Sequence, residues 1–182
     1  MMIPGDFVLE LVPHCASVPR EGWAGDHDLR PLSEQGRRQA EALVPALGTG
    51  IDAIFSSPAL RCGQTVRPLA AAAGRPVEAL DTLAESGGFT QPPDWVHGVL
   101  APMGGAVGGA YATGRMLRAV ATMSARHPGR RVVAASHGDV IPVLLATLCA
   151  FCEAPPPALV GRGGWYTLRF DHHTVTITSR SA

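Results

Sequence analysis

The chain alternates short apolar segments with longer segments of helical periodicity, and this alternation is the feature that most restricts its fold. Apolar segments typical of buried strands cover 7–12 (FVLELV), 52–57 (DAIFSS) and 131–136 (RVVAAS), and a shorter strand is expected over 76–79. Helices between strands favour a largely parallel or mixed sheet that is covered on both faces. We therefore predict an α/β fold, a three-layer sandwich of one sheet flanked by helices.

The helical segments have recognisable ends, and helices are expected over 33–47, 58–73, 111–127 and 140–151. Ser33 is a good N-terminal cap for the first helix, and glycines follow its end. Pro68 lies within the second helix and is expected to kink or divide it. The C-terminal segments GWYTLRF and TVTITSR alternate and are expected to pair as a hairpin.

Residues 86–109 break this pattern, because they are rich in glycine and proline and have weak periodicity. Two interpretations stay open for this insertion, a lid over a substrate and a plain surface loop. No internal repeat or linker is visible in the 182 residues, so we expect a single domain over 1–182.

Composition excludes several classes of protein. Apolar residues make up 46% of the chain and charged residues 16%, which is typical of a compact globular domain. The formal net charge is zero and no dense basic run occurs, so neither a nucleic-acid partner nor an anionic membrane is expected. No signal peptide or long apolar span is visible, and we expect a cytoplasmic protein. Cys149 and Cys152 form an isolated C-x-x-C without a second pair, so we predict two small apolar residues and no metal site.

Two histidines follow directly after predicted strands. His14 comes at the end of the first strand and His137 at the end of the strand over 131–136. Open α/β sheets place their sites beyond the carboxyl ends of their strands, so the two histidines are expected to share one site. Arg61 is expected in the first turn of a helix, where a guanidinium and free N–H groups together bind phosphate. The sequence therefore predicts a pocket for an oxyanion.

Five sequence blocks occur in a fixed order between residues 7 and 148: LVPHCAS, HDLRPLSEQGRRQAEAL, SSPALRCGQT, LAES and VVAASHGDVI. Together they resemble the motifs of the histidine phosphatase superfamily, which is phosphoglycerate-mutase-like. The resemblance is nearest to small bacterial phosphohistidine phosphatases and to Nudix-linked histidine phosphatase domains. It implies a phosphohydrolase of the phosphoric monoester class, acting on a small phosphorylated molecule or a phosphoprotein.

The resemblance also implies roles for individual residues. His14 would be the nucleophile that accepts the phosphoryl group and forms a phosphohistidine. Arg61 and His137 would hold the phosphoryl oxygens, with help from the backbone N–H of Gly138. Glu85 would protonate the leaving oxygen and later accept a proton from water. Neither a metal nor a cofactor is implied.

Pro13 departs from these motifs, because the superfamily normally carries an arginine before the nucleophilic histidine. Proline offers neither a charge nor an N–H donor. The loss of one charged donor to the transferring group is expected to cost roughly 2–4 kcal/mol, about two to three orders of magnitude in rate. Arg20 and Arg30 are candidates to replace it, and Arg30 is the better one because it belongs to the RPL block.

Three other interpretations stay open. His14 and Cys15 with Arg20 resemble the H-C-x5-R loop of cysteine-dependent phosphatases, although the interval here has four residues. A non-catalytic module that binds a phosphorylated ligand, and a member repurposed for a different reaction, are both compatible with Pro13.

The remaining histidines fit no ligand spacing and are expected at the surface: His27, His97, His127, His172 and His173.

Overall fold

The computed structural model describes residues 5–85, 92, 105–171 and 174–181. These residues form one six-stranded sheet with the strand order β3-β2-β4-β1-β5-β6. The strands are β1 (Phe7–Pro13), β2 (Ala53–Ser56), β3 (Val77–Ala79), β4 (Arg131–Ser136), β5 (Trp165–Phe170) and β6 (Val175–Arg180). Strands β1 to β4 are parallel to one another, whereas β5 runs antiparallel to β1 and pairs with β6 as a hairpin. The predicted mixed sheet and the predicted C-terminal hairpin are confirmed.

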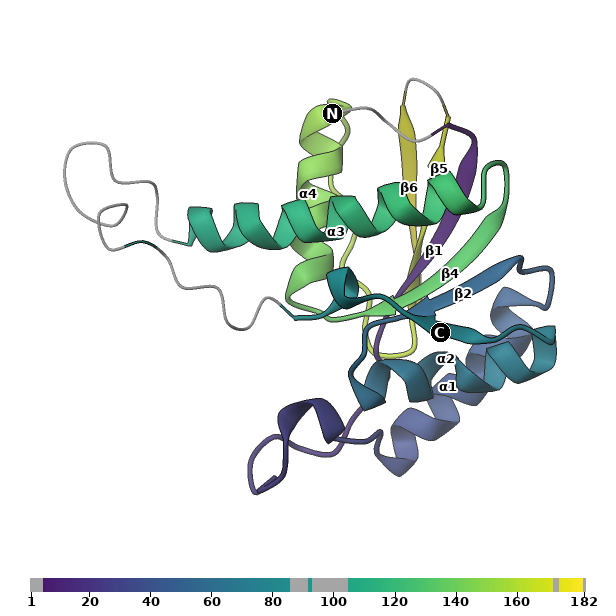
Figure 1. Ribbon diagram of the computed structural model, residues 1–182, viewed down its shortest axis with the longest axis vertical. Coiled ribbons are helices and arrows are strands. Elements are labelled where there is room, and N and C mark those ends of the chain that lie inside the picture. Colours follow the sequence, from purple (N-terminus) through teal and green to yellow (C-terminus); the bar gives the residue numbers. More distant parts are fainter. Residues whose placement is uncertain (1–4, 86–91, 93–104, 172–173, 182) are drawn as a thin grey trace.

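Four α-helices of the described residues cover the two faces of this sheet (Figure 1). Helices α1 (Glu34–Leu47) and α2 (Leu60–Ala73) pack together on one face, and α3 (Ala106–Arg126) and α4 (Val140–Phe151) pack on the other. Each face has its own apolar core because side chains alternate along the strands. On β4, for example, Val132 and Ala134 lie in the core under α3 and α4, and Val133 and Ala135 lie in the core under α1 and α2. The predicted three-layer sandwich is confirmed.

Helix ends agree with the sequence where capping chemistry is strong. The Ser33 hydroxyl accepts a hydrogen bond from the N–H of Gly36 (3.1 Å) at the start of α1, as an N-terminal cap does. Helix α2 begins two residues after Pro58 and continues through Pro68 to Ala73. Of the two predicted effects of Pro68, division of the helix is wrong, because buried neighbours on α2 hold both of its halves against the sheet, and a kink stays a prediction.

Helix α3 begins at Ala106, five residues before the predicted start at 111. Residues 106–109 are therefore helical, although their glycine-rich sequence predicted a loop. The reason is that a helix packed along the sheet tolerates glycines whose weak intrinsic propensity opposes it in isolation. The remainder of the insertion, 86–91 and 93–104, lies outside the described residues.

Candidate active site

The two histidines lie side by side at the carboxyl edge of the sheet. Strands β1 and β4 are neighbours, and Pro13 is in register with Ser136. The next residue of each strand is therefore a histidine at the same level of the sheet, and the N–H of His14 donates to the carbonyl oxygen of Ser136 (2.8 Å). The ring centroids of His14 and His137 are 5.5 Å apart. The sheet thus brings together two residues that are far apart in the sequence.

His14 is fixed in one tautomer by the backbone of the next residue. Its Nδ1 lies 2.8 Å from the carbonyl oxygen of Cys15. A carbonyl oxygen can only accept a hydrogen bond, so Nδ1 carries the proton and Nε2 presents a lone pair. Burial and the neighbouring charge of Arg162 lower the pKa of His14 to about 3. The imidazole is therefore neutral at physiological pH, as a nitrogen nucleophile must be.

Arg61 lies in the first turn of α2 and is completely buried. One of its terminal nitrogens, Nη2, donates to Oε1 of Glu85 (2.9 Å). The same carboxylate oxygen lies 3.1 Å from Nδ1 of His137. The structure thus places Arg61, His137 and Glu85 in direct contact, beside His14.

Glu85 is the most exposed member of this group, with 32% of its side chain accessible. It follows the 3-10 helix η2 (Asp81–Leu83), which leads out of the short edge strand β3. The hydrogen bond from His137 and the charges of His137 and Arg61 lower the pKa of the Glu85 carboxyl. The protonation of Glu85 therefore depends on whether Arg61 and His137 contact its carboxylate or another group.

His27 belongs to the site, and the prediction of a plain surface position for it is wrong. It opens the 3-10 helix η1 (His27–Leu29), and its Nε2 lies 3.2 Å from Oε2 of Glu85. Its carbonyl oxygen accepts a hydrogen bond from Nη1 of Arg61 (2.8 Å). The available signal in the sequence was its place at the start of the HDLRPL block, three residues before Arg30.

Arg30 closes η1 and is 8% exposed. Its Nη1 donates to the hydroxyl of Ser17 (2.7 Å) and to the carbonyl oxygen of Val18 (2.6 Å). These bonds tie part of the guanidinium to the loop that follows β1. The charges of Arg61, Glu85 and Arg162 all act on it, so Arg30 borders the site. Its role in binding phosphate stays a prediction.

Arg162 is a site residue that the sequence did not reveal. It lies between α4 and β5, and its Nη1 donates to the carbonyl oxygen of His14 (2.6 Å). Its charge also contributes to the lowered pKa of His14. No motif surrounds it except a run of glycines, GRGG, which predicts a turn and nothing about its contacts.

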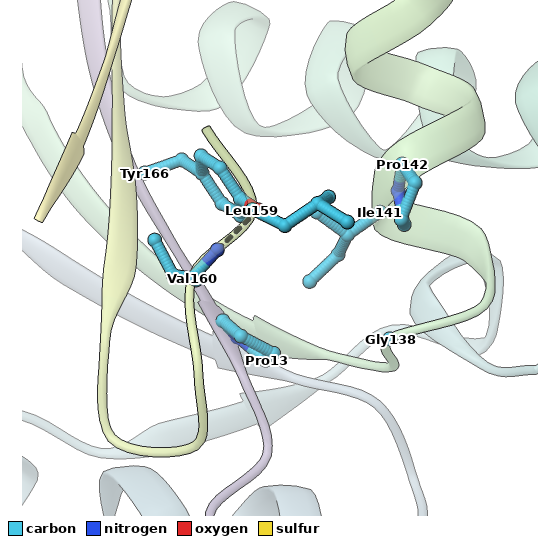
Figure 2. A pocket seen from close by; sticks show the side chains of 7 residues that line it. All are labelled: Pro13, Gly138, Ile141, Pro142, Leu159, Val160 and Tyr166. Atoms are coloured by element: carbon cyan, nitrogen blue, oxygen red, sulfur yellow. Dashed lines mark hydrogen bonds between the residues drawn. The ribbon is translucent and has the colours of Figure 1, made fainter. Parts of the chain in front are cut away.

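Pro13 lines a small, largely apolar cavity of about 130 Å³ on the α4 side of β1 (Figure 2). Gly138 lines the same cavity, together with Ile141, Pro142, Leu159, Val160 and Tyr166. The Tyr166 hydroxyl accepts a hydrogen bond from the N–H of Val160 (3.0 Å), which closes one wall. Position 13 thus presents an apolar surface directly before His14 in the chain, and the role of the Gly138 N–H stays a prediction.

Cys15 has properties opposite to those of a nucleophilic cysteine. Its side chain is completely buried, and burial raises the pKa of the thiol to about 11. A thiol of this kind stays protonated at neutral pH, whereas nucleophilic attack requires the thiolate. Arg20, the other half of the alternative motif, is exposed to solvent. The cysteine-dependent interpretation therefore has no support from the geometry.

No group of three or more histidine, cysteine, aspartate or glutamate side chains within the described residues is placed to hold a metal ion. In the same part of the chain, no helix has the length and apolarity needed to cross a membrane.

Comparison with known proteins agrees with this fold. An 8-oxo-(d)GTP phosphatase of Mycolicibacterium smegmatis is 41% identical over 61 residues, which are 33% of this chain and 19% of that relative. YhfR from Bacillus stearothermophilus has the same fold, with a TM-score of 0.70 and 21% identity over 94% of this chain and 95% of its own. A phosphoserine phosphatase from Entamoeba histolytica matches with a TM-score of 0.67 and 17% identity over 94% of both chains. The family model described as histidine phosphatase superfamily (branch 1) matches residues 11–181, and the chain belongs to that superfamily.

Proposed function

We propose that this protein is a phosphohydrolase that acts on a phosphorylated small molecule or phosphoprotein through a phosphohistidine on His14. The observation that carries the proposal is the state of His14, which is neutral, has Nδ1 fixed as a donor to Cys15, and presents Nε2 as a free nucleophile. Membership of the histidine phosphatase superfamily supports the same reaction class.

The charge of the site fits a phosphoryl group. Three guanidinium groups, those of Arg30, Arg61 and Arg162, act on one another here, and the Glu85 carboxylate acts on all of them. With His14 neutral, positive charge exceeds negative charge in the pocket. Fixed positive donors stabilise the oxygens of a transferring phosphoryl group without reorganisation. The site is therefore suited to a dianionic phosphate ester.

In the first step, Nε2 of His14 attacks the phosphorus atom and the bond from phosphorus to the ester oxygen breaks. The leaving oxygen takes a proton from the carboxyl group of Glu85. The products of this step are phosphohistidine, the free alcohol and the Glu85 carboxylate. Arg61 and His137 hold the phosphoryl oxygens throughout.

In the second step, water attacks the phosphorus atom and gives a proton to the Glu85 carboxylate. The bond from phosphorus to Nε2 breaks, inorganic phosphate leaves, and His14 recovers its lone pair. Glu85 must therefore carry a proton when the ester binds. A phosphoryl group that takes over Arg61 and His137 removes the contacts that lower the pKa of Glu85 and adds negative charge beside it. Substrate binding itself thus promotes the acid form.

Pro13 favours a second candidate, a module that binds a phosphorylated ligand without turnover, because position 13 contributes no charged donor. A binding module has no need of a neutral nucleophile or of a carboxyl group whose protonation responds to the ligand. For this reason catalysis is the preferred proposal.

The test is turnover and trapping on a panel of phosphate compounds: p-nitrophenyl phosphate, phosphoserine, 3-phosphoglycerate and 8-oxo-dGTP. The wild type is expected to release phosphate from at least one of them and to form an acid-labile, base-stable phosphohistidine after an alkaline quench. His14→Gln should lose both signals. His127→Gln is the matched control, because the His127 ring packs on Phe55 away from the site, and it should retain both. Phosphate binding without turnover or label would establish the binding module instead.

A further inference from the structure

Arg162 lies in a four-residue turn, Gly161–Gly164, directly before β5. Because β5 runs antiparallel to β1, the start of β5 lies at the carboxyl end of β1, where His14 is. The antiparallel strand thus adds one more loop to the edge of the sheet at which the parallel strands end. Arg162 is the only residue of this turn that has a side chain.

The conformation of the turn is set by its glycines. The N–H of Gly164 donates to the carbonyl oxygen of Gly161 (3.1 Å), and Gly163 has a φ of 92°, a value that favours glycine at this position of a turn. A Cβ atom at Gly164 would lie 2.6 Å from the carbonyl oxygen of Arg180 and 2.9 Å from the Cβ of Val160. The glycines therefore fix the conformation of this turn, and the turn fixes the backbone position of Arg162.

Two hydrogen bonds then position Arg162 relative to the nucleophile. Its Nη1 donates to the carbonyl oxygen of His14 (2.6 Å). Its own carbonyl oxygen accepts from Nε2 of Gln39 (2.9 Å), while Oε1 of Gln39 accepts from the N–H of Ala16 (2.9 Å). The backbone and the side chain of Arg162 are thus both tied to the segment 14–16. A guanidinium held in this way is preorganised for a ligand at His14.

Within the part of the chain that the structure describes, no ion pair neutralises the charge of Arg162. Among the described residues, no carboxylate lies within 4.0 Å of its guanidinium, whereas Arg61 pairs with Glu85 at 2.9 Å. A guanidinium has five N–H donors, and the described contact with His14 uses one of them. Arg162 is exposed as a residue. The positive charge of the Arg162 guanidinium, held beside neutral His14, therefore favours the binding of an anionic ligand.

We propose that Arg162 binds the phosphoryl group that His14 accepts and so supplies a charged donor next to the nucleophile, where Pro13 supplies none. This inference rests on the proposed function, and it adds a substrate-binding residue to it. One N–H of the guanidinium keeps its bond to the His14 carbonyl oxygen, and others donate to a phosphoryl oxygen. The donors act on the negative charge of the group as it moves from the ester oxygen to Nε2.

The experiment compares Arg162→Ala and Arg162→Lys with Arg169→Ala. Arg169 is the matched control, because it is an exposed arginine on β5 at the opposite edge of the sheet. Each protein is assayed for kcat/KM on the best ester of the panel and for the affinity of orthovanadate by calorimetry. Arg162→Ala is expected to lose about 10²- to 10³-fold in kcat/KM and at least tenfold in orthovanadate affinity. Arg162→Lys should recover part of both, because it keeps the charge without the fork, and Arg169→Ala should match the wild type.

A rescue variant separates binding from a structural role. Pro13→Arg in the Arg162→Ala background restores a guanidinium next to His14 from the other side, and it should recover at least tenfold of the lost kcat/KM and of the orthovanadate affinity. A variant that merely lost the anchor of His14 would not be rescued in this way. Arg30→Ala is measured in parallel.

The outcomes separate this proposal from the proposed function. If Arg162→Ala stays within twofold of the wild type in both assays while the wild type turns over, Arg162 does not bind the substrate and the function stands. If Arg162→Ala is slow but binds orthovanadate normally, Arg162 only positions His14, and the proposal is overturned. If the wild type binds orthovanadate without turnover, the hydrolase proposal fails, and the loss of affinity in Arg162→Ala still supports Arg162 as a ligand of the anion. A wild type that does neither overturns both proposals.

Discussion

Replacing Glu85 by glutamine is expected to slow turnover and, at the same time, to tighten the binding of a phosphate mimic. The carboxylate now contacts three groups that an anion would use or displace, namely Arg61 (2.9 Å), His137 (3.1 Å) and His27 (3.2 Å). A glutamine keeps the shape but removes the negative charge. The two effects therefore have opposite signs, which a general loss of structure does not produce.

The size of each effect follows from these contacts. A bound anion must displace the carboxylate from Arg61 and His137, and charge-assisted hydrogen bonds of this kind are about twice as strong as neutral ones. Replacing the carboxylate by an amide weakens its contacts with Arg61 and His137. The free energy of anion binding is therefore expected to improve by about 1–2 kcal/mol, which is roughly a 5- to 30-fold gain in orthovanadate affinity. Losing the general acid is expected to lower kcat by roughly 10²- to 10⁴-fold on an alkyl phosphate.

The leaving group provides an internal check on the role of Glu85. p-Nitrophenolate leaves without a proton, so the first step of p-nitrophenyl phosphate should stay fast in Glu85→Gln, while the second step still lacks its base. A burst of p-nitrophenolate and an accumulation of phosphohistidine are expected in rapid-quench experiments. Glu78→Gln is the matched control, because Glu78 pairs with Arg126 on the surface, and it should behave like the wild type.

Two results would refute this reasoning. Weaker orthovanadate binding in Glu85→Gln would mean that the carboxylate organises the pocket and does not compete with the anion. An equal loss of rate on alkyl and p-nitrophenyl esters in the first step would remove the general acid from the mechanism.

Three further predictions concern His14 and its surroundings. Gly36→Ala should destabilise the protein by about 2 kcal/mol or more in urea titrations, because a Cβ there would lie 1.8 Å from the carbonyl oxygen of Ala16. Gly114→Ala on α3, with open space around it, should instead stabilise the protein by up to about 1 kcal/mol. Since the pKa of His14 is lowered to about 3 in the folded protein, the unfolded chain binds a proton below pH 6.5 that the folded chain does not. The free energy of unfolding should therefore fall by about 1 kcal/mol per pH unit as the pH drops below 6.5. Between pH 6.5 and 4.5 this slope should be shallower in His14→Gln, and equal slopes would contradict the lowered pKa. Cys15→Ala should keep at least about a third of the wild-type kcat, since the thiol pKa of about 11 keeps the group protonated, and an inactive but folded variant would reinstate the cysteine mechanism.

The sequence by itself determined the elements whose signals are local. Apolar alternation located the strands, Ser33 marked the start of α1, and the predicted range 140–151 coincides with α4. Because His14 and His137 follow parallel strands directly, the sequence also implied that they meet at one edge of the sheet. Local signals were weak in the glycine-rich segment before α3, and there the start of the helix was misplaced by five residues.

Only the tertiary structure decided which other side chains complete the site. Arg162 contacts His14 across 148 residues of sequence, and Arg61 reaches His27 across 34. The first contact depends on the order of the strands, which places β5 beside β1. The second depends on how η1 lies against α2. Propensity and periodicity report the conformation of a segment, whereas a contact between distant segments is fixed by how the layers pack. For that reason the meeting of His14 and His137 could be predicted from the sequence, and the arginine beside them could not.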